Sequence, residues 1–132
     1  MKITADTNVL VRAIMGDDAL QSAIARSELA NAEIVALALP ALCELVWVLS
    51  RGYKIPPSQI SQTIRHLINS ANVEVNHAAV EAGLDMLDAG GDFADGVIVF
   101  EGQWLGGEAF VSFDKKAVKL LEVRGERARL LT

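Results

Sequence analysis

The chain has 132 residues, of which 52% are apolar and only 5% aromatic, and its net charge is −5 at pH 7. This length suits one domain, residues 1–132, and the composition predicts an aliphatic core of the kind formed by helices packed on a parallel sheet. The negative charge excludes a broad basic surface for holding nucleic acid, although a site that binds divalent cations need not repel phosphate.

Hydrophobic periodicity and turn signals predict five short strands separated by helices. The predicted strands are residues 2–5, 33–39, 73–75, 109–113 and 128–131. The predicted helices are one that follows Asp6-Thr7-Asn8 and those at residues 19–30, 40–51, 58–69, 77–89, 92–105 and 115–123. Strands and helices in this order predict an α/β fold in which helices cover both faces of a parallel sheet.

The sequence predicts a cytoplasmic protein without a membrane span. The most apolar stretch, residues 34–49, is interrupted by Pro40 and Glu44, whereas a span needs roughly 20 largely unbroken apolar residues. The opening residues reach the carboxylate of Asp6 too early for the apolar part of a secretory signal. The single cysteine, Cys43, cannot form an internal disulfide and fits a reducing compartment.

Five acidic residues lie in or against apolar stretches of sequence, where packing gives no reason for a charged side chain. They are Asp6, Glu44, Asp92, Asp95 and Asp114. Because a buried, ionised carboxylate is destabilising unless a positive charge meets it, these residues predict a shared cation. Hard carboxylate oxygens favour magnesium or manganese, and the chain offers no set of Cys and His residues for zinc.

The local setting of each acid predicts its role. Asp6 and Asp114 follow predicted strands, at the rim where parallel α/β sheets bind ligands, but each also precedes a helix and fits a capping role equally well. Glu44 has apolar neighbours on both sides and is not expected to be a simple solvated residue. Asp95 and Asp92 share one face of a first helical turn, so we expect Asp95 to be a metal ligand and Asp92 a helix cap or an outer partner of the ligands.

The remaining polar and aromatic residues suggest no other chemistry. His66 and His77 lie in predicted helices without ligand neighbours and are expected to be solvated or structural. Trp47, which neighbours Glu44 on the helix, is expected in the core rather than as a platform for base stacking. The sequence contains no recognisable Ser/His/Asp or Cys/His nucleophile set and no Gly-rich loop that would cradle phosphate.

Four short segments carry these acids: DTN from Asp6, CELVWVLSRGY around Glu44, DFADGVIV around Asp95 and SFDKKAV around Asp114. Together they resemble the PIN-domain ribonucleases. Their order and spacing and the total length are similar to those of the VapC toxins of bacterial and archaeal toxin–antitoxin pairs, and the resemblance spans the whole chain. It implies a three-layer α/β/α fold with a central parallel sheet, a magnesium or manganese ion, and endonucleolytic cleavage of single-stranded or looped RNA.

By motif position, the resemblance gives the chain four catalytic acids, which are Asp6, Glu44, Asp95 and Asp114. Asp6 and Asp95 are implied as the ligands of the metal ion. Asn8 fills the third place of the opening motif, and Ser112 stands where the family often has Thr before its last acid. These two residues are expected beside the acids.

One segment departs from the family pattern. Glu101 and Gln103 stand where small residues are more usual after the third acid, so local packing or the choice of partner is expected to differ. The resemblance also implies regulation by a cognate antitoxin protein. The high apolar content and low charge predict more exposed hydrophobic surface than a lone monomer keeps, which fits a homodimer and a groove for an antitoxin segment.

Three other classes of protein share part of this pattern. A haloacid-dehalogenase-like phosphatase also has an Asp after its first strand, but it needs a second acid two residues on, where this chain has Asn8. A receiver domain also has an acidic magnesium pocket, but it needs paired acids there and a Lys at the end of a late strand. A non-catalytic interaction module is the third alternative, and the presence of every acidic position argues against it.

Overall fold

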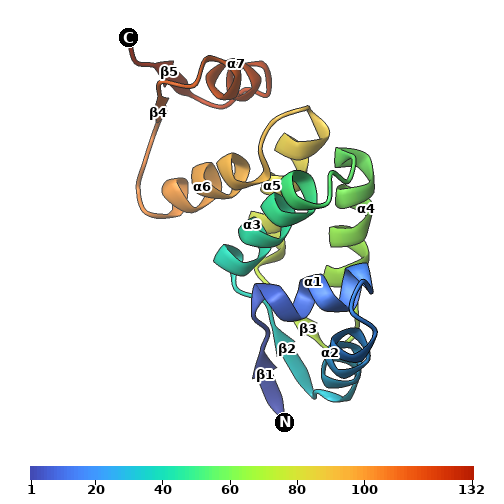
Figure 1. Ribbon diagram of the computed structural model, residues 1–132. Coiled ribbons are helices and arrows are strands. Elements are labelled where there is room, and N and C mark those ends of the chain that lie inside the picture. Colours follow the sequence, from blue (N-terminus) through green and yellow to red (C-terminus); the bar gives the residue numbers. More distant parts are fainter. The chain divides into compact units, whose positions relative to one another are not determined.

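The computed structural model describes residues 1–132 and belongs to the α/β class, with seven α-helices, one π-helix and five short strands. The chain divides into two compact units, Met1–Asn76 (unit 1) and His77–Thr132 (unit 2), and each is described by itself. Strands β1 to β3 belong to unit 1, and β4 and β5 belong to unit 2 (Figure 1). None of the helices is long and apolar enough to cross a membrane.

Unit 1 consists of three parallel strands and the helices that connect them. Its elements are β1 (Lys2–Thr4), α1 (Thr7–Met15), α2 (Ala19–Asn31), β2 (Ile34–Ala36), α3 (Leu39–Trp47), the π-helix η1 (Val48–Gly52), α4 (Pro57–Ile68) and β3 (Val73–Glu74). The strand order is β1-β2-β3, with Val35 opposite both Ile3 and Val73. Because the strands are parallel, the starts of α1 and α3 lie at the same edge of this sheet.

Apolar side chains at helical spacing form the core of unit 1. The stripe on α3 and η1 consists of Leu42, Leu45, Val46 and Leu49, all buried at the i, i+3, i+4 and i+7 positions of one face. The stripe on α4 consists of Ile60, Ile64 and Ile68. These stripes fix which face of each helix is left for polar side chains.

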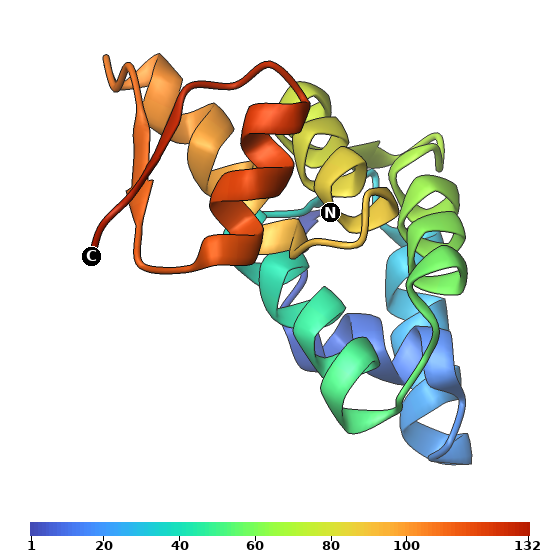
Figure 2. The same ribbon diagram turned by 90° about the horizontal axis from the view of Figure 1, so that it is seen from above.

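Unit 2 consists of a helix pair and a two-stranded parallel sheet. Its elements are α5 (His77–Asp88), α6 (Phe93–Trp104), β4 (Phe110–Ser112), α7 (Lys115–Val123) and β5 (Ala128–Leu130). β4 pairs with β5 so that Val111 lies opposite Arg129. The helix that connects the two strands, α7, packs against both of them (Figure 2).

Two glycines allow α5 and α6 to pack unusually closely. A Cβ atom at Gly83 of α5 would lie 2.7 Å from the ring of Phe93, which is fully buried. A Cβ atom at Gly96 of α6 would collide with the backbone carbonyl of Ala82. Only residues without a side chain permit this approach, so these positions fix the start of α6 against α5.

The predicted order of strands and helices and their parallel pairing are confirmed, with two differences. The strands form two sheets, of three and two strands, rather than one central sheet. Each sheet contains only the strands of its own unit, β1 to β3 in unit 1 and β4 and β5 in unit 2. The strand predicted at residues 33–39 is only Ile34–Ala36, because α3 already begins at Leu39.

Candidate functional site

The first group of predicted residues lies where α1 meets α3 in unit 1. Asp6 caps α1, and its Oδ1 atom accepts a hydrogen bond from the backbone N–H of Thr7 at 2.7 Å. The hydroxyl of the buried Thr7 lies 3.3 Å from Oε2 of Glu44 and 3.3 Å from the carbonyl oxygen of Ala41, and these two acceptors share its single proton. Thr7 therefore connects the turn that carries Asp6 to the face of α3 that carries Glu44.

These residues border a cavity of about 400 Å³. Asp6 and Glu44 supply two carboxylates to it, and Asn8 supplies a carboxamide. Arg12 and Tyr53 line the same cavity, together with apolar side chains of α1 and η1. The cavity thus combines hard oxygen ligands with one guanidinium group.

A chain of polar contacts holds Arg12 beside this cavity. Arg12 donates from Nε to Oε1 of Gln21 at 2.8 Å and from Nη1 to Oδ1 of Asp17 at 3.1 Å. The hydroxyl of Tyr53 donates to the other carboxylate oxygen of Asp17 at 2.7 Å. This bond from Tyr53, and to a smaller degree the positive charge of Arg12, lowers the pKa of Asp17, and the same bond raises the pKa of Tyr53.

The second group of predicted residues lies in unit 2. Asp92 caps α6 by accepting from the backbone N–H of Ala94 at 3.1 Å, and Asp114 caps α7 by accepting from the N–H of Ala117 at 3.1 Å. Asp95 lies in the first turn of α6 and is half-buried. Burial, followed by the negative charges of Asp92 and Asp114, raises the pKa of Asp95.

The raised pKa of Asp95 means that its ionised form is disfavoured where it lies. The negative charges of Asp92 and Asp114 lie close enough to affect Asp95, and burial also disfavours the charge on Asp95. A divalent cation would offset both effects, and carboxylate oxygens are the donors that magnesium and manganese prefer. The residues therefore fit a metal ion, although within each unit no three His, Cys, Asp or Glu side chains form a metal-binding group by themselves.

Ser112 has a local structural role in this group. Its Oγ atom accepts a hydrogen bond from the backbone N–H of Asp114 at 3.0 Å, which orders the turn between β4 and α7. Ser112 therefore contacts the backbone of Asp114, and its proposed place in the site stays a prediction. The capping roles that the sequence left open for Asp6 and Asp114 are also present, and each cap hydrogen bond uses one carboxylate oxygen.

Two expectations about α3 are wrong. Glu44 is exposed rather than enclosed by its apolar neighbours, and Trp47 is 62% exposed rather than part of the core. Both lie on the face of α3 opposite the buried stripe of Leu42, Leu45 and Val46. Asp6, Asp92 and Asp114 are exposed as well, so of the five acids only Asp95 is partly removed from water.

Sequence analysis missed Arg12, Asp17 and Tyr53. Arg12 could have been recognised from the sequence, because it lies four residues after Asn8 and therefore on the same face of α1. Tyr53 could not have been recognised in this way, since its contact with Asp17 joins positions 36 residues apart.

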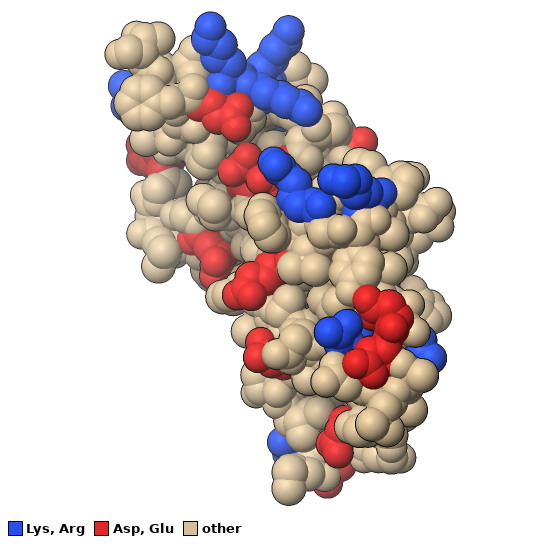
Figure 3. Space-filling model, in the orientation of Figure 1, with Lys and Arg blue, Asp and Glu red and all other residues tan.

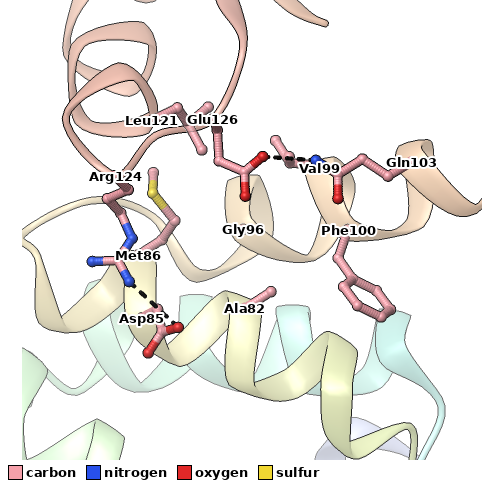
Figure 4. A pocket seen from close by; sticks show the side chains of 10 residues that line it. All are labelled: Ala82, Asp85, Met86, Gly96, Val99, Phe100, Gln103, Leu121, Arg124 and Glu126. Carbon is pink, nitrogen blue, oxygen red and sulfur yellow. Dashed lines mark hydrogen bonds and ion pairs between the residues drawn. The ribbon is translucent and has the colours of Figure 1, made fainter. Parts of the chain in front are cut away.

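A smaller cavity of about 130 Å³ lies among α5, α6 and the end of α7, and it contains none of the predicted acids (Figure 4). Two polar contacts border it. Arg124 pairs with Asp85 at 3.4 Å, and Nε2 of Gln103 donates to Oε2 of Glu126 at 2.7 Å. Gln103, at a position where the PIN ribonucleases that the sequence resembles more usually have a small residue, thus connects α6 to the segment before β5.

No protein-family model and no curated protein matches this sequence.

Proposed function

We propose that the chain is a magnesium- or manganese-dependent endoribonuclease. The observation that carries the proposal is the cavity of unit 1, which is lined by the carboxylates of Asp6 and Glu44 and by Arg12. Metal-dependent hydrolysis of a phosphodiester uses oxygen ligands for a divalent cation, and a cationic donor stabilises the phosphate; this cavity contains both kinds of group.

The acids of unit 2 support the same proposal. An ionised Asp95 is disfavoured by burial and by its neighbours Asp92 and Asp114, so the group gains from a bound cation. As the sequence resemblance implies, we assign Asp6 in unit 1 and Asp95 in unit 2 as metal ligands. Asp92 serves as the cap of α6, and its side chain adds negative charge beside Asp95.

When bound, a magnesium or manganese ion polarises the phosphorus and lowers the pKa of a coordinated water. We assign Glu44 or Asp114 to orienting the attacking water or to helping hold a second ion. In-line attack of water on phosphorus would break the bond to the 3′ oxygen, which would leave as a hydroxyl. The products would then be a 5′-phosphate and a 3′-hydroxyl.

The distribution of charge in unit 2 supports a polyanionic substrate. Residues 77–114 contain eight acidic residues and no Lys or Arg, whereas residues 115–132 contain six Lys or Arg and two Glu. The basic side chains gather over α7 and β5, directly after Asp114 (Figure 3). RNA is a substrate whose phosphates this segment would attract.

The sequence resemblance to VapC toxins adds a biological role to the proposal. It includes a PIN-like three-layer fold, a cytoplasmic location, and action as the toxin of a pair whose cognate antitoxin is a small protein. Exposed apolar side chains in unit 2, namely Trp104, Leu105 and Phe113, support contact with a protein partner, either the antitoxin or a second copy of the chain.

Cleavage assays with matched variants test the enzyme. A labelled RNA is incubated with magnesium and either the wild-type protein, Asp6→Asn or Asp95→Asn, and we expect both variants to lose cleavage while circular dichroism stays unchanged. Asp18→Asn is the control, because Asp18 caps α2 in the same way but does not border the cavity. Full activity of a folded Asp6 or Asp95 variant would remove that residue from the metal site.

A growth experiment tests the toxin. Induction of the chain alone should arrest growth by depleting RNA needed for translation, and co-expression of the product of the adjacent gene should restore it. The Asp95→Asn variant should be harmless at equal expression. Normal growth with abundant, folded wild-type protein would favour a housekeeping nuclease, and hydrolysis of p-nitrophenyl phosphate without cleavage of RNA would favour a phosphatase.

A further inference from the structure

Arg12 is the one Lys or Arg side chain that lines the cavity of Asp6 and Glu44. It lies one helical turn after Asn8, which also lines the cavity. Its side chain is 36% exposed, so it is partly accessible to solvent. Arg12 therefore lines the same cavity as Asp6 and Glu44, and its ion-pair partner is Asp17.

The guanidinium group is held but not saturated. Of its five N–H donors, Nε is used by Gln21 and one of Nη1 by Asp17, and no hydrogen bond from Nη2 is present. Asp17 is itself held by Tyr53, which follows η1 and lines the same cavity. These contacts fix the plane of the guanidinium group. Arg12 therefore loses little conformational entropy when a ligand binds to it.

Resting on the proposed function, we propose that Arg12 binds a phosphate of the RNA next to the one that is cleaved, and that Asp17 and Tyr53 are its positioning residues. A guanidinium group recognises phosphate through parallel N–H donors, and the Nη2 donors remain for this contact. The carboxamide of Asn8 adds a further donor on the same face of α1.

Arg26 provides an internal comparison. It also connects α2 to α1, since its Nε donates to the carbonyl oxygen of Ala13 at 2.9 Å, and it is exposed. It does not line the cavity. A purely structural arginine between these helices therefore exists in the same unit, and Arg26→Gln is a control that removes equal charge.

The experiment measures kcat and KM for an RNA oligonucleotide at several salt concentrations. We expect Arg12→Gln to raise KM roughly tenfold or more with a smaller change in kcat, because a charge-assisted hydrogen bond to the bound RNA is lost. The dependence of log KM on log salt concentration should become shallower by roughly 0.7, the value for one phosphate contact on a single strand. Arg12→Lys should recover the salt dependence and only part of KM.

The supporting residues give a graded result. Tyr53→Phe removes the hydroxyl that holds Asp17 and should raise KM severalfold without changing the salt dependence, because the charge of Arg12 remains. Arg26→Gln should leave both quantities at their wild-type values. Thermal unfolding of every variant shows whether it is folded under the assay conditions.

Each outcome bears on a separate statement. A wild-type KM and salt dependence in Arg12→Gln, with cleavage intact, would overturn the phosphate contact alone and leave the nuclease. An equal rise of KM in Arg26→Gln would show that Arg12 acts only through the packing of α1 on α2. A wild-type protein that does not cleave RNA would overturn the proposed function together with this inference.

Discussion

Thr7 donates a hydrogen bond to Glu44 across 3.3 Å, although the two residues are 37 positions apart in the sequence. Thr7 is buried and Glu44 is exposed, so the contact attaches an exposed carboxylate to a fixed point at the start of α1. Asp6 is fixed at the same point through the backbone N–H of Thr7. Residue 7 therefore contacts both carboxylates, Glu44 through its hydroxyl and Asp6 through its backbone N–H.

Thr7→Val is expected to destabilise the protein and to impair its activity. Valine keeps the branched shape but loses the hydroxyl, so the free energy of unfolding should fall by about 1 kcal/mol. Cleavage should also decrease because Glu44 is no longer restrained. Urea denaturation and an RNA cleavage assay measure the two effects, and Thr7→Ser, which keeps the hydroxyl, should retain cleavage. Equal activity of the two variants would show that this contact does not orient Glu44.

Asp95→Asn should stabilise the protein at neutral pH in the absence of metal. Burial and the charges of Asp92 and Asp114 raise the pKa of Asp95 above its ordinary value of 3.8. Between 3.8 and the raised pKa, the folded state binds more protons than the unfolded state, so stability falls as the pH rises through this interval and stays reduced at neutral pH. Thermal unfolding in EDTA at pH 7 should give a higher Tm for the variant, and the difference should disappear at acidic pH. A lower Tm for the variant at pH 7 would contradict this account.

Manganese should reverse the order of stability. An ion that binds only the folded state stabilises it by roughly 2.7 kcal/mol when its concentration is 100 times the Kd. Wild-type protein should therefore gain Tm on addition of manganese and lose the gain on addition of EDTA, while Asp95→Asn should show little change. An unchanged wild-type Tm at millimolar manganese would argue against a metal site.

The two acids at the start of α6 should differ in their effect on metal affinity. Asp92→Asn keeps a good helix cap and should change the affinity little, whereas Asp95→Asn removes an assigned ligand. Calorimetric titration with manganese measures both variants. A larger loss of affinity for Asp92→Asn would reverse the two assignments and leave the nuclease proposal standing.

Gly96→Ala should destabilise the protein, whereas Gly102→Ala should not. A methyl group at Gly96 meets the carbonyl of Ala82, which cannot move without separating α5 from α6, and we expect a loss of about 1–3 kcal/mol or more. Gly102 lies in the same helix with no atom near its Cβ position, so alanine there should add about 0.4–1 kcal/mol through helix propensity. Chemical denaturation measures the free energy of unfolding of both variants. Equal changes in the two variants would contradict this prediction.

The sequence was sufficient to predict the order of the elements, and it offered helix capping as one of two roles for Asp6, Asp92 and Asp114. Caps are local features, and Asp6, Asp92 and Asp114 each precede a helix whose first turn they bond. The exposure of Glu44 was also readable in principle. Within the apolar run around Glu44, only residues 42, 45, 46 and 49 are spaced to form one buried face of the helix. Glu44 lies on the opposite face.

Features that depend on distant parts of the chain were not predictable. The contact between Tyr53 and Asp17 and the one between Thr7 and Glu44 arise only when helices pack, and neither leaves a periodic pattern. The division of the strands into two sheets has the same origin, because alternation of strands and helices predicts parallel pairing but not which strands share a sheet. The collision at Gly96 likewise depends on the backbone of another helix.

The close packing of α5 on α6 has a kinetic consequence. The two helices are consecutive and separated only by residues 89–92, so their contacts are local and close small loops. In unit 1, by contrast, the pairing of Lys2 with Ile34 must bring together residues far apart in the sequence. We therefore expect the turn of Asp92 and Asp95 to form early in folding and the cavity of Asp6 and Glu44 to form late. Gly96→Ala should accordingly slow refolding, whereas Thr7→Val should mainly speed unfolding.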